Sequence, residues 1–138
     1  MNILYLGCYD QPFGQSPRSF DYAGYLAEAG HRVIFLSNSY DNYNLNNVSI
    51  PSLKLWCEDP KTKNLLGKYI RLKTPKYSNS FGRLINMLIN GICILVFGIF
   101  CFFKKQKFDV IIGPSVPTFT SFSGVLLSKI FSCCFCFE

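Results

Sequence analysis

Hydrophobic and polar positions in the first part of the chain predict a strand, a helix and a second strand. Residues 2–7 form a short apolar run, and 18–29 carry apolar side chains at three- and four-residue steps. Gly30 suits the left-handed turn that ends a helix, and residues 31–37, with their apolar run 33–36, predict a second strand. This order is a βαβ unit, in which the two strands lie parallel in one sheet.

The middle of the chain gives weaker signals. Residues 38–47 are polar and predict a loop. Residues 48–56 predict a further strand, which Pro51 places at a sheet edge because proline has no N–H to donate. Residues 57–80 are basic and irregular, so no element is predicted there.

The last part of the chain returns to a helix, a strand and a helix. Residues 84–103 form an uncharged apolar run that predicts a long helix, and 108–113 predict a strand. A proline-rich turn at 114–117 leads into a helix over 118–131. That helix presents an apolar set of side chains: Phe119, Phe122, Val125, Leu126 and Ile130.

Residues 132–138 are apolar up to the final glutamate and do not alternate with polar positions. Such a run is typical of a strand that is buried on both faces of a parallel sheet. Together the elements predict one α/β domain with a Rossmann-like three-layer architecture and a mostly parallel sheet.

The amino-acid composition is unusually apolar. The 138 residues suffice for one domain, and 49% of them are hydrophobic. Only 16% are charged, against about 25% in average globular chains. The mean hydropathy of +0.21 excludes a disordered chain. It also exceeds what a soluble domain of this size needs, which favours contact with a membrane or with a partner surface.

The net charge of +6 is concentrated in one region. Ten basic residues and no acidic ones lie between Lys61 and Lys107. Such a field attracts phosphates, nucleic acid or anionic lipid, and a solvated basic face explains it equally well. Nucleic-acid binding is disfavoured because few aromatic residues lie among these bases, Tyr69 and Tyr77 being the main exceptions.

Seven cysteines do not indicate disulfides or a metal site. The number is odd, and residues 1–7 lack the basic start of a signal peptide, so the thiols should stay reduced. The one CxxC spacing, Cys133 to Cys136, has no second pair to complete a metal site, and the only histidine, His31, is far from the cysteines at the end of the chain. We interpret the cysteines as small apolar core residues and predict neither a metal nor a cofactor.

Two segments carry a resemblance to a known family. The first is MNILYLGCYDQPFG, continuing through SPRSFDYAGYLAEAGHRVIFLS, and the second is FDVIIGPSVPTFTSFSGVLLSKIF. Both resemble the N-terminal domain of family 4 glycosyltransferases of the GT-B fold, and the final CFCFE is similar to a strand of the same domain. The nearest subset is the bacterial transferases that build cell-surface polysaccharide.

The resemblance implies a retaining transfer of a sugar from a nucleotide-sugar to a lipid-linked or saccharide acceptor, without a metal. It implies a cytoplasmic protein that is peripheral or monotopic at the inner face of the plasma membrane. A GT-B enzyme also needs a second domain that holds the donor, and the 138 residues do not include one. We therefore expect residues 1–138 to be an incomplete N-terminal half, inactive by itself.

The candidate substrate-binding residues follow the strand ends, where open α/β sheets bind ligands. Gly14, Gln15 and Arg18 lie at or after the first of these loops, Ser115 follows a later strand, and Glu138 closes the last. The first loop is also explained as a plain strand-to-helix turn. An anionic ligand or Asp21 should compensate Arg18, because a cation is unfavourable in the first turn of a helix. No catalytic residue is assigned.

Residues 84–103 are long enough to span a bilayer. Three alternatives stay open: an interfacial helix, a helix buried in the protein, and a true span. Asn86 and Asn90 share one helical face, which we expect to be the wetter one. The flanking bases expected at the membrane interface are Lys76, Arg83, Lys104 and Lys105.

The rival to the glycosyltransferase hypothesis is a small non-enzymatic protein with a cytosolic head and a hydrophobic anchor. His31 is interpreted as a turn residue rather than as a base. The sequence does not identify the sugar, the acceptor, the linkage or the oligomeric state.

Overall fold

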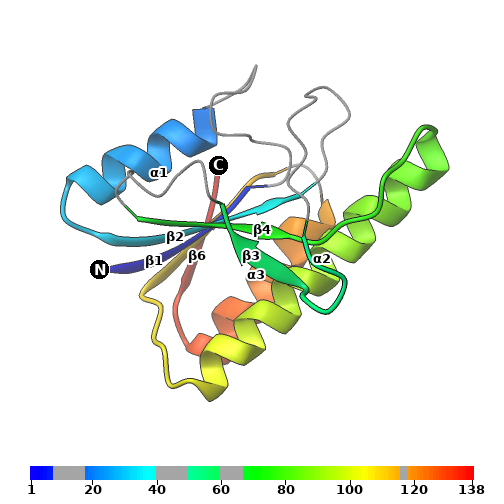
Figure 1. The fold of residues 1–138 in the computed structure, drawn as a ribbon. Helices are drawn as coiled ribbons and strands as arrows, with labels where there is room; N and C mark the ends of the chain where they lie inside the picture. Colours follow the sequence, from blue (N-terminus) through cyan, green and yellow to red (C-terminus); the bar gives the residue numbers. More distant parts are fainter. Residues whose placement is uncertain (8–17, 40–49, 60–66, 116–117) are drawn as a thin grey trace.

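The computed structural model describes residues 1–7, 18–39, 50–59, 67–115 and 118–138 (Figure 1). Its elements in chain order are β1 (Asn2–Leu6), α1 (Arg18–Glu28), β2 (Arg32–Asn38), β3 (Trp56–Glu58), β4 (Lys68–Leu72), α2 (Ser80–Phe103), β5 (Val110–Gly113), α3 (Thr118–Phe131) and β6 (Cys134–Phe137).

The strands form one sheet in the order β3-β4-β2-β1-β5-β6. β3 pairs antiparallel with β4, and every other neighbouring pair is parallel. α1 covers one face of the sheet, while α2 and α3 lie on the other (Figure 1). The predicted α/β class, with a Rossmann-like three-layer architecture and a mostly parallel sheet, is confirmed.

The core alternates along the central strands. On β1, Ile3 and Tyr5 belong to the cluster that packs under α1, whereas Leu4 and Leu6 belong to the cluster under α2 and α3. On the α1 side, Phe20 inserts against the rings of Phe35 and Tyr69, with centroid separations of 6.0 and 4.6 Å. Both faces of the central strands are therefore buried, which explains their unbroken apolar sequence.

The expectation that residues 57–80 are irregular is wrong. β4 lies inside the sheet between β3 and β2, and Arg71 at its centre is 3% exposed. Its Nε lies 2.7 Å from Oδ2 of Asp59, which is fully buried. The strand was missed because two charged residues, Lys68 and Arg71, interrupt its hydrophobic pattern. The ion pair with Asp59 that makes Arg71 compatible with burial is not visible in a local pattern.

Two further strand predictions need correction. Within 48–56 the described residues 50–55 form no strand, and Leu53 and Leu55 are exposed; the strand begins only at Trp56. β6 is an edge strand rather than a doubly buried one, because β5 is its one partner among the described residues. Cys134, Cys136 and Phe137 are accordingly exposed.

The three helices end in the same way. In each, the N–H of the second residue after the cap donates to the carbonyl oxygen five residues earlier: His31 N to Leu26 O, Gln106 N to Cys101 O, and Cys133 N to Ser128 O. The left-handed residue of this motif is Gly30 in α1, with φ of 84°, as predicted. It is Lys105 in α2 and Ser132 in α3, with φ of 56° and 52°.

α2 begins earlier than predicted. Asn79 caps it, and its Oδ1 accepts a hydrogen bond of 2.7 Å from the N–H of Gly82. The charged residue Arg83 therefore lies inside the first turn of the helix rather than before it. The helix has 24 residues and a length of about 36 Å at 1.5 Å per residue.

The buried face of α2 combines small and polar residues with the apolar side chains of Ile94 and Phe97. Asn86 and Asn90 are fully buried, so the expectation that they mark the wetter face is wrong. Asn90 Nδ2 donates to Thr120 Oγ1 of α3 at 3.2 Å, and Ser123 Oγ donates to Gly91 O at 2.9 Å. The burial pattern of α3 is similar, because Thr120, Ser121, Ser123 and Ser128 are buried while Phe119, Phe122 and Ile130 are exposed.

Small residues let the two helices approach closely. A methyl group on Gly91 would lie 3.0 Å from the carbonyl oxygen of Phe119, and one on Gly98 would overlap the fully buried side chain of Leu127. Close approach at small residues, with hydrogen bonds from Ser, Thr and Asn between helices, is typical of helix pairs in membranes.

We predict that Gly98→Ala lowers the free energy of unfolding by about 1–3 kcal/mol, because the added methyl group overpacks the α2–α3 contact. Gly24→Ala is the matched control: the same change in mid-helix meets no atom within 4 Å. It should stabilise the protein by about 0.5–1 kcal/mol through helix propensity. Urea denaturation of both variants measures the difference, and equal effects would contradict the packing argument.

Candidate functional site

The carboxyl ends of the parallel strands form one edge of the sheet, which is where ligands bind in open α/β folds. Gly7 follows β1 at this edge and donates from its N–H to Leu36 O at 2.7 Å. A side chain at Gly7 would collide with the ring of Phe35, so the backbone of β1 lies directly on β2 here.

Three of the predicted substrate-binding residues meet at this edge. Arg18, in the first turn of α1, lies with Nε 3.4 Å from Oε1 of Glu138. The N–H of Ser115 donates to the backbone carbonyl of Glu138 at 3.1 Å, and the hydroxyl of Tyr5 donates to its carboxylate. Gly14 and Gln15 lie outside the described residues.

The charge of Arg18 is therefore balanced by Glu138, a residue 120 positions later in the sequence. The prediction named an anionic ligand or Asp21 for this role. The side chain of Arg18 is 70% exposed and that of Glu138 is 14% exposed. The guanidinium can thus donate bidentate hydrogen bonds to a phosphate, while the carboxylate can accept hydrogen bonds from sugar hydroxyls.

Sequence reasoning missed Asn38, the last residue of β2. Its side chain is fully buried, and neither Nδ2 nor Oδ1 has a hydrogen-bond partner among the described residues. The neighbouring Thr74 is also buried with its hydroxyl unpaired, while its backbone N–H donates to Ser39 Oγ at 3.2 Å. Unpaired buried polar groups cost about 1–3 kcal/mol each, so a group that satisfies them is expected at this edge.

A signal for Asn38 existed in the sequence. Asn38 directly follows the predicted strand 31–37, at the strand end where ligands bind. We assigned it to a loop because the residues after it are rich in asparagine. By strand alternation Asn38 lies on the same side of the sheet as Leu36, facing the α2–α3 layer. Arg18 and Tyr5 belong to the α1 side, so the edge carries polar groups on both sides of the sheet.

The predicted interface bases all lie on the surface. Lys76 and Arg83 precede or open α2, and Lys104 and Lys105 follow its end; all four are exposed. Arg71, another of the ten bases between Lys61 and Lys107, is instead buried against Asp59. His31 lies in the turn between α1 and β2, as predicted.

The cysteines divide into two groups. Cys93 and Cys101 are buried, as the core interpretation predicts, but Cys134 and Cys136 are exposed on the edge strand. Burial raises the pKa of Cys101 to about 11 against the opposing effect of Lys104, so this thiol stays neutral at physiological pH. Within the described ranges no group of three or more His, Cys, Asp or Glu residues could hold a metal.

α2 is long and apolar enough to cross a membrane, with a mean hydropathy of 2.4 in its most apolar window. The strands on either side of it, β4 and β5, nevertheless belong to one sheet. A helix that crossed a bilayer would separate these strands, so a span is incompatible with this fold.

Comparison with known proteins gives the fold alone. No family model and no curated protein matches the chain. Among solved structures it is similar to the C-terminal domain of a hydrogenase from Pyrococcus furiosus, in two crystal structures of that domain. The TM-scores are 0.63 and 0.67, at 11% and 14% identity. Each match covers 99% of this chain, and 89% or 90% of the other.

We predict that Asn38→Leu raises the free energy of unfolding by about 1–2 kcal/mol, because it removes two unpaired buried groups at nearly constant volume. The control is Asn86→Leu, since Asn86 is also fully buried but its Nδ2 donates to Pro75 O at 2.7 Å. That variant should leave the stability unchanged or lower it. Thermal or urea unfolding measures both, and a destabilised Asn38→Leu would show that the carboxamide is already satisfied.

Proposed function

We propose that the chain is the N-terminal, acceptor-side part of a membrane-associated retaining glycosyltransferase. It would act in surface polysaccharide synthesis, with a nucleotide-sugar as donor and a lipid-linked saccharide as acceptor. The sequence resemblance suggests the reaction, and the shared α/β fold is compatible with it. The observation that carries the proposal is the outer surface of the α2–α3 layer.

This surface, which we call the outer apolar face, consists of thirteen exposed apolar side chains of α2 and α3. They are Phe81, Leu84, Ile85, Leu88, Ile92, Val96, Ile99, Phe100, Phe102 and Phe103 of α2, with Phe119, Phe122 and Ile130 of α3. Soluble proteins rarely expose so large an apolar patch, and here the same helices bury Asn, Thr and Ser instead. An apolar exterior over a polar helix contact suits a bilayer as the surrounding medium.

Charge at the ends of this face supports a membrane rather than a protein partner. Arg83 lies at one end of α2 and Lys104 and Lys105 at the other, and no acidic residue lies between positions 60 and 108. Each base near an anionic bilayer surface contributes about 1 kcal/mol. The helix would lie along the leaflet with both ends cytoplasmic, where it would present the carboxyl edge to lipid-linked substrates.

The roles of the edge residues follow from this arrangement. Arg18 would bind a diphosphate, which the N-terminus of α1 also favours through its dipole. Glu138 would accept hydrogen bonds from the acceptor sugar, and the unpaired Asn38 would bind a further polar group. Stabilisation of the leaving diphosphate needs donors from a second domain, so this chain would supply only half of the site.

The second candidate function is a small non-enzymatic membrane protein that α2 anchors by crossing the bilayer, as its length and hydropathy allow. This alternative requires that the sheet containing β4 and β5 does not form. Cysteine labelling in intact membranes separates the two: Cys57 precedes α2 and Cys136 follows it. The transferase half requires both thiols on the same side of the membrane. Opposite sides would establish the anchored protein.

We predict that the purified chain floats with phospholipid vesicles, and that Ile92→Asn/Ile99→Asn weakens this binding at least tenfold by removing apolar area from the outer apolar face. The control Tyr25→Asn/Leu53→Asn changes two exposed apolar residues elsewhere, 65% and 101% exposed, and should bind as the unaltered chain does. Vesicle flotation with circular dichroism as a folding check measures both. Equal binding by all three would contradict a membrane role for this face.

We further predict that the chain binds a polyprenyl-diphosphate-linked sugar in those vesicles without turning it over. Arg18→Gln should weaken this binding about tenfold, because a charge-assisted hydrogen bond to phosphate is worth about 1.5–3 kcal/mol. Lys129→Gln removes another exposed charge, in the last turn of α3 at the opposite edge of the sheet, and is the control. Sugar transfer by this chain alone, given a nucleotide-sugar, would contradict the acceptor-half assignment.

A further inference from the structure

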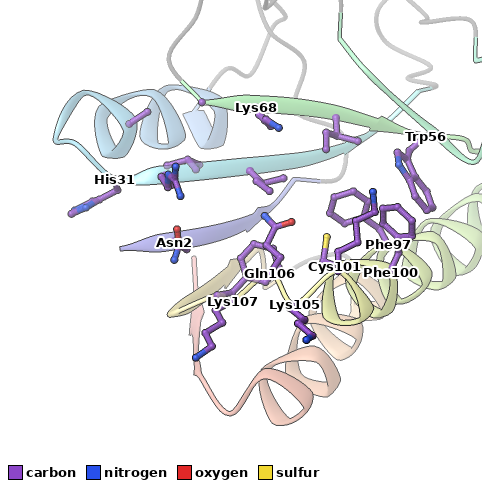
Figure 2. Close-up of a pocket in the computed structure, with 18 of the residues that line it drawn as sticks. Asn2, His31, Trp56, Lys68, Phe97, Phe100, Cys101, Lys105, Gln106 and Lys107 are labelled. Atoms are coloured by element: carbon purple, nitrogen blue, oxygen red, sulfur yellow. The ribbon is translucent and has the colours of Figure 1, made fainter.

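A second concave site lies at the opposite edge of the sheet. A pocket of about 980 Å³ opens between the amino ends of β1, β2 and β4 and the end of α2 (Figure 2). Asn2, Arg32 and Lys68, the first residues of these strands, line one side, and the turn after α2 lines the other. Its size is at the upper end of the range for ligand pockets, about 300–1,000 Å³.

The rim of this pocket is strongly basic. Five full positive charges line it, and none of the described lining residues is acidic; the five are Arg32, Lys68, Lys104, Lys105 and Lys107. Part of this charge balances the carboxyl ends of α1 and α2, which both lie at this edge. Each helix end carries only about half a negative charge, so most of the positive charge stays available to an anion.

One wall of the pocket is aromatic. The ring of Trp56 lies 5.3 Å from that of Phe97 and 5.4 Å from that of Phe100, measured between centroids. Lys104 Nζ lies 4.7 Å from the centre of the Phe100 ring. Figure 2 shows these rings at one end of the pocket and Lys68, Gln106 and Lys107 along the remainder.

The pocket and the outer apolar face share a residue. Phe100 lines the pocket and is 42% exposed, and Val96 and Phe103, one helical turn before and after it, are exposed members of the outer apolar face. The aromatic wall is therefore continuous with the surface that we assign to the membrane, and the basic rim lies where headgroups would be. A phosphate at the rim and the first carbons of a lipid along the wall would both find complementary surfaces.

We propose that this pocket binds the phosphate group of an anionic membrane lipid, with the lysines on the phosphate and Trp56 and Phe100 on the glycerol and upper acyl carbons. The inference rests on the proposed membrane face, and it adds a second lipid-binding site at the edge opposite to the candidate transfer site. The bound lipid would fix the orientation of the protein on the leaflet and would not take part in the transfer reaction.

Trp56 is the only tryptophan in the chain and reports directly on this pocket. Dihexanoylphosphatidylglycerol, titrated below its micelle concentration, should change the Trp56 fluorescence and should bind at least tenfold more tightly than inorganic phosphate. Lys68→Gln/Lys107→Gln should weaken this binding at least tenfold. Lys54→Gln/Lys129→Gln loses the same charge outside the pocket and should weaken it less than threefold.

The outcomes are distinct. Equal binding of inorganic phosphate and of the short lipid would assign the pocket to free anions and overturn the lipid proposal. No fluorescence change, or equal weakening in the two lysine pairs, would overturn the pocket itself. Because the short lipid forms no bilayer, this titration is independent of the vesicle flotation that tests the outer apolar face, so either proposal can fail without the other.

Discussion

Close packing between α2 and α3 is the interaction on which the rest of this structure depends. The two helices approach at Gly91 and Gly98, and Asn90, Thr120 and Ser123 form the hydrogen bonds between or beside them. Because small and polar residues occupy most of this contact, many large apolar residues of both helices lie on the outside of the protein, while Ile94, Phe97 and Leu127 are buried. The excess hydrophobicity of the chain thus becomes one surface rather than a larger core.

The direction of the helices assigns different chemistry to the two edges of the sheet. Helix N-termini lie at the carboxyl edge, where their dipoles favour an anion beside Arg18. Helix C-termini lie at the amino edge, where the dipoles oppose an anion and Lys104, Lys105 and their neighbours reverse the local potential. An anion at the amino edge therefore needs positively charged side chains to bind. At the carboxyl edge such side chains only add to the favourable helix dipoles.

Local patterns were sufficient for the order of most elements, for Gly30 and for the meeting of Arg18, Ser115 and Glu138, since strand ends converge in any parallel sheet. Local patterns were insufficient where a partner from another segment determines whether a residue can be buried. Arg71 is compatible with an inner strand only because Asp59 neutralises it. The orientation of α2 was misjudged because a nearly uniform apolar helix has no sequence signal for which face the fold buries, and the basic pocket combines segments that lie far apart in the chain.

The position of β6 has a consequence for the behaviour of the protein in solution. Among the described residues this strand has a neighbour on one side only, and its other side presents backbone donors and acceptors beside exposed Cys134, Cys136 and Phe137. Sheet edges of this kind recruit further strands, from the same polypeptide or from another molecule. Concentration and thiol oxidation should therefore control self-association of this chain at the end of its sheet remote from β3, independently of any lipid.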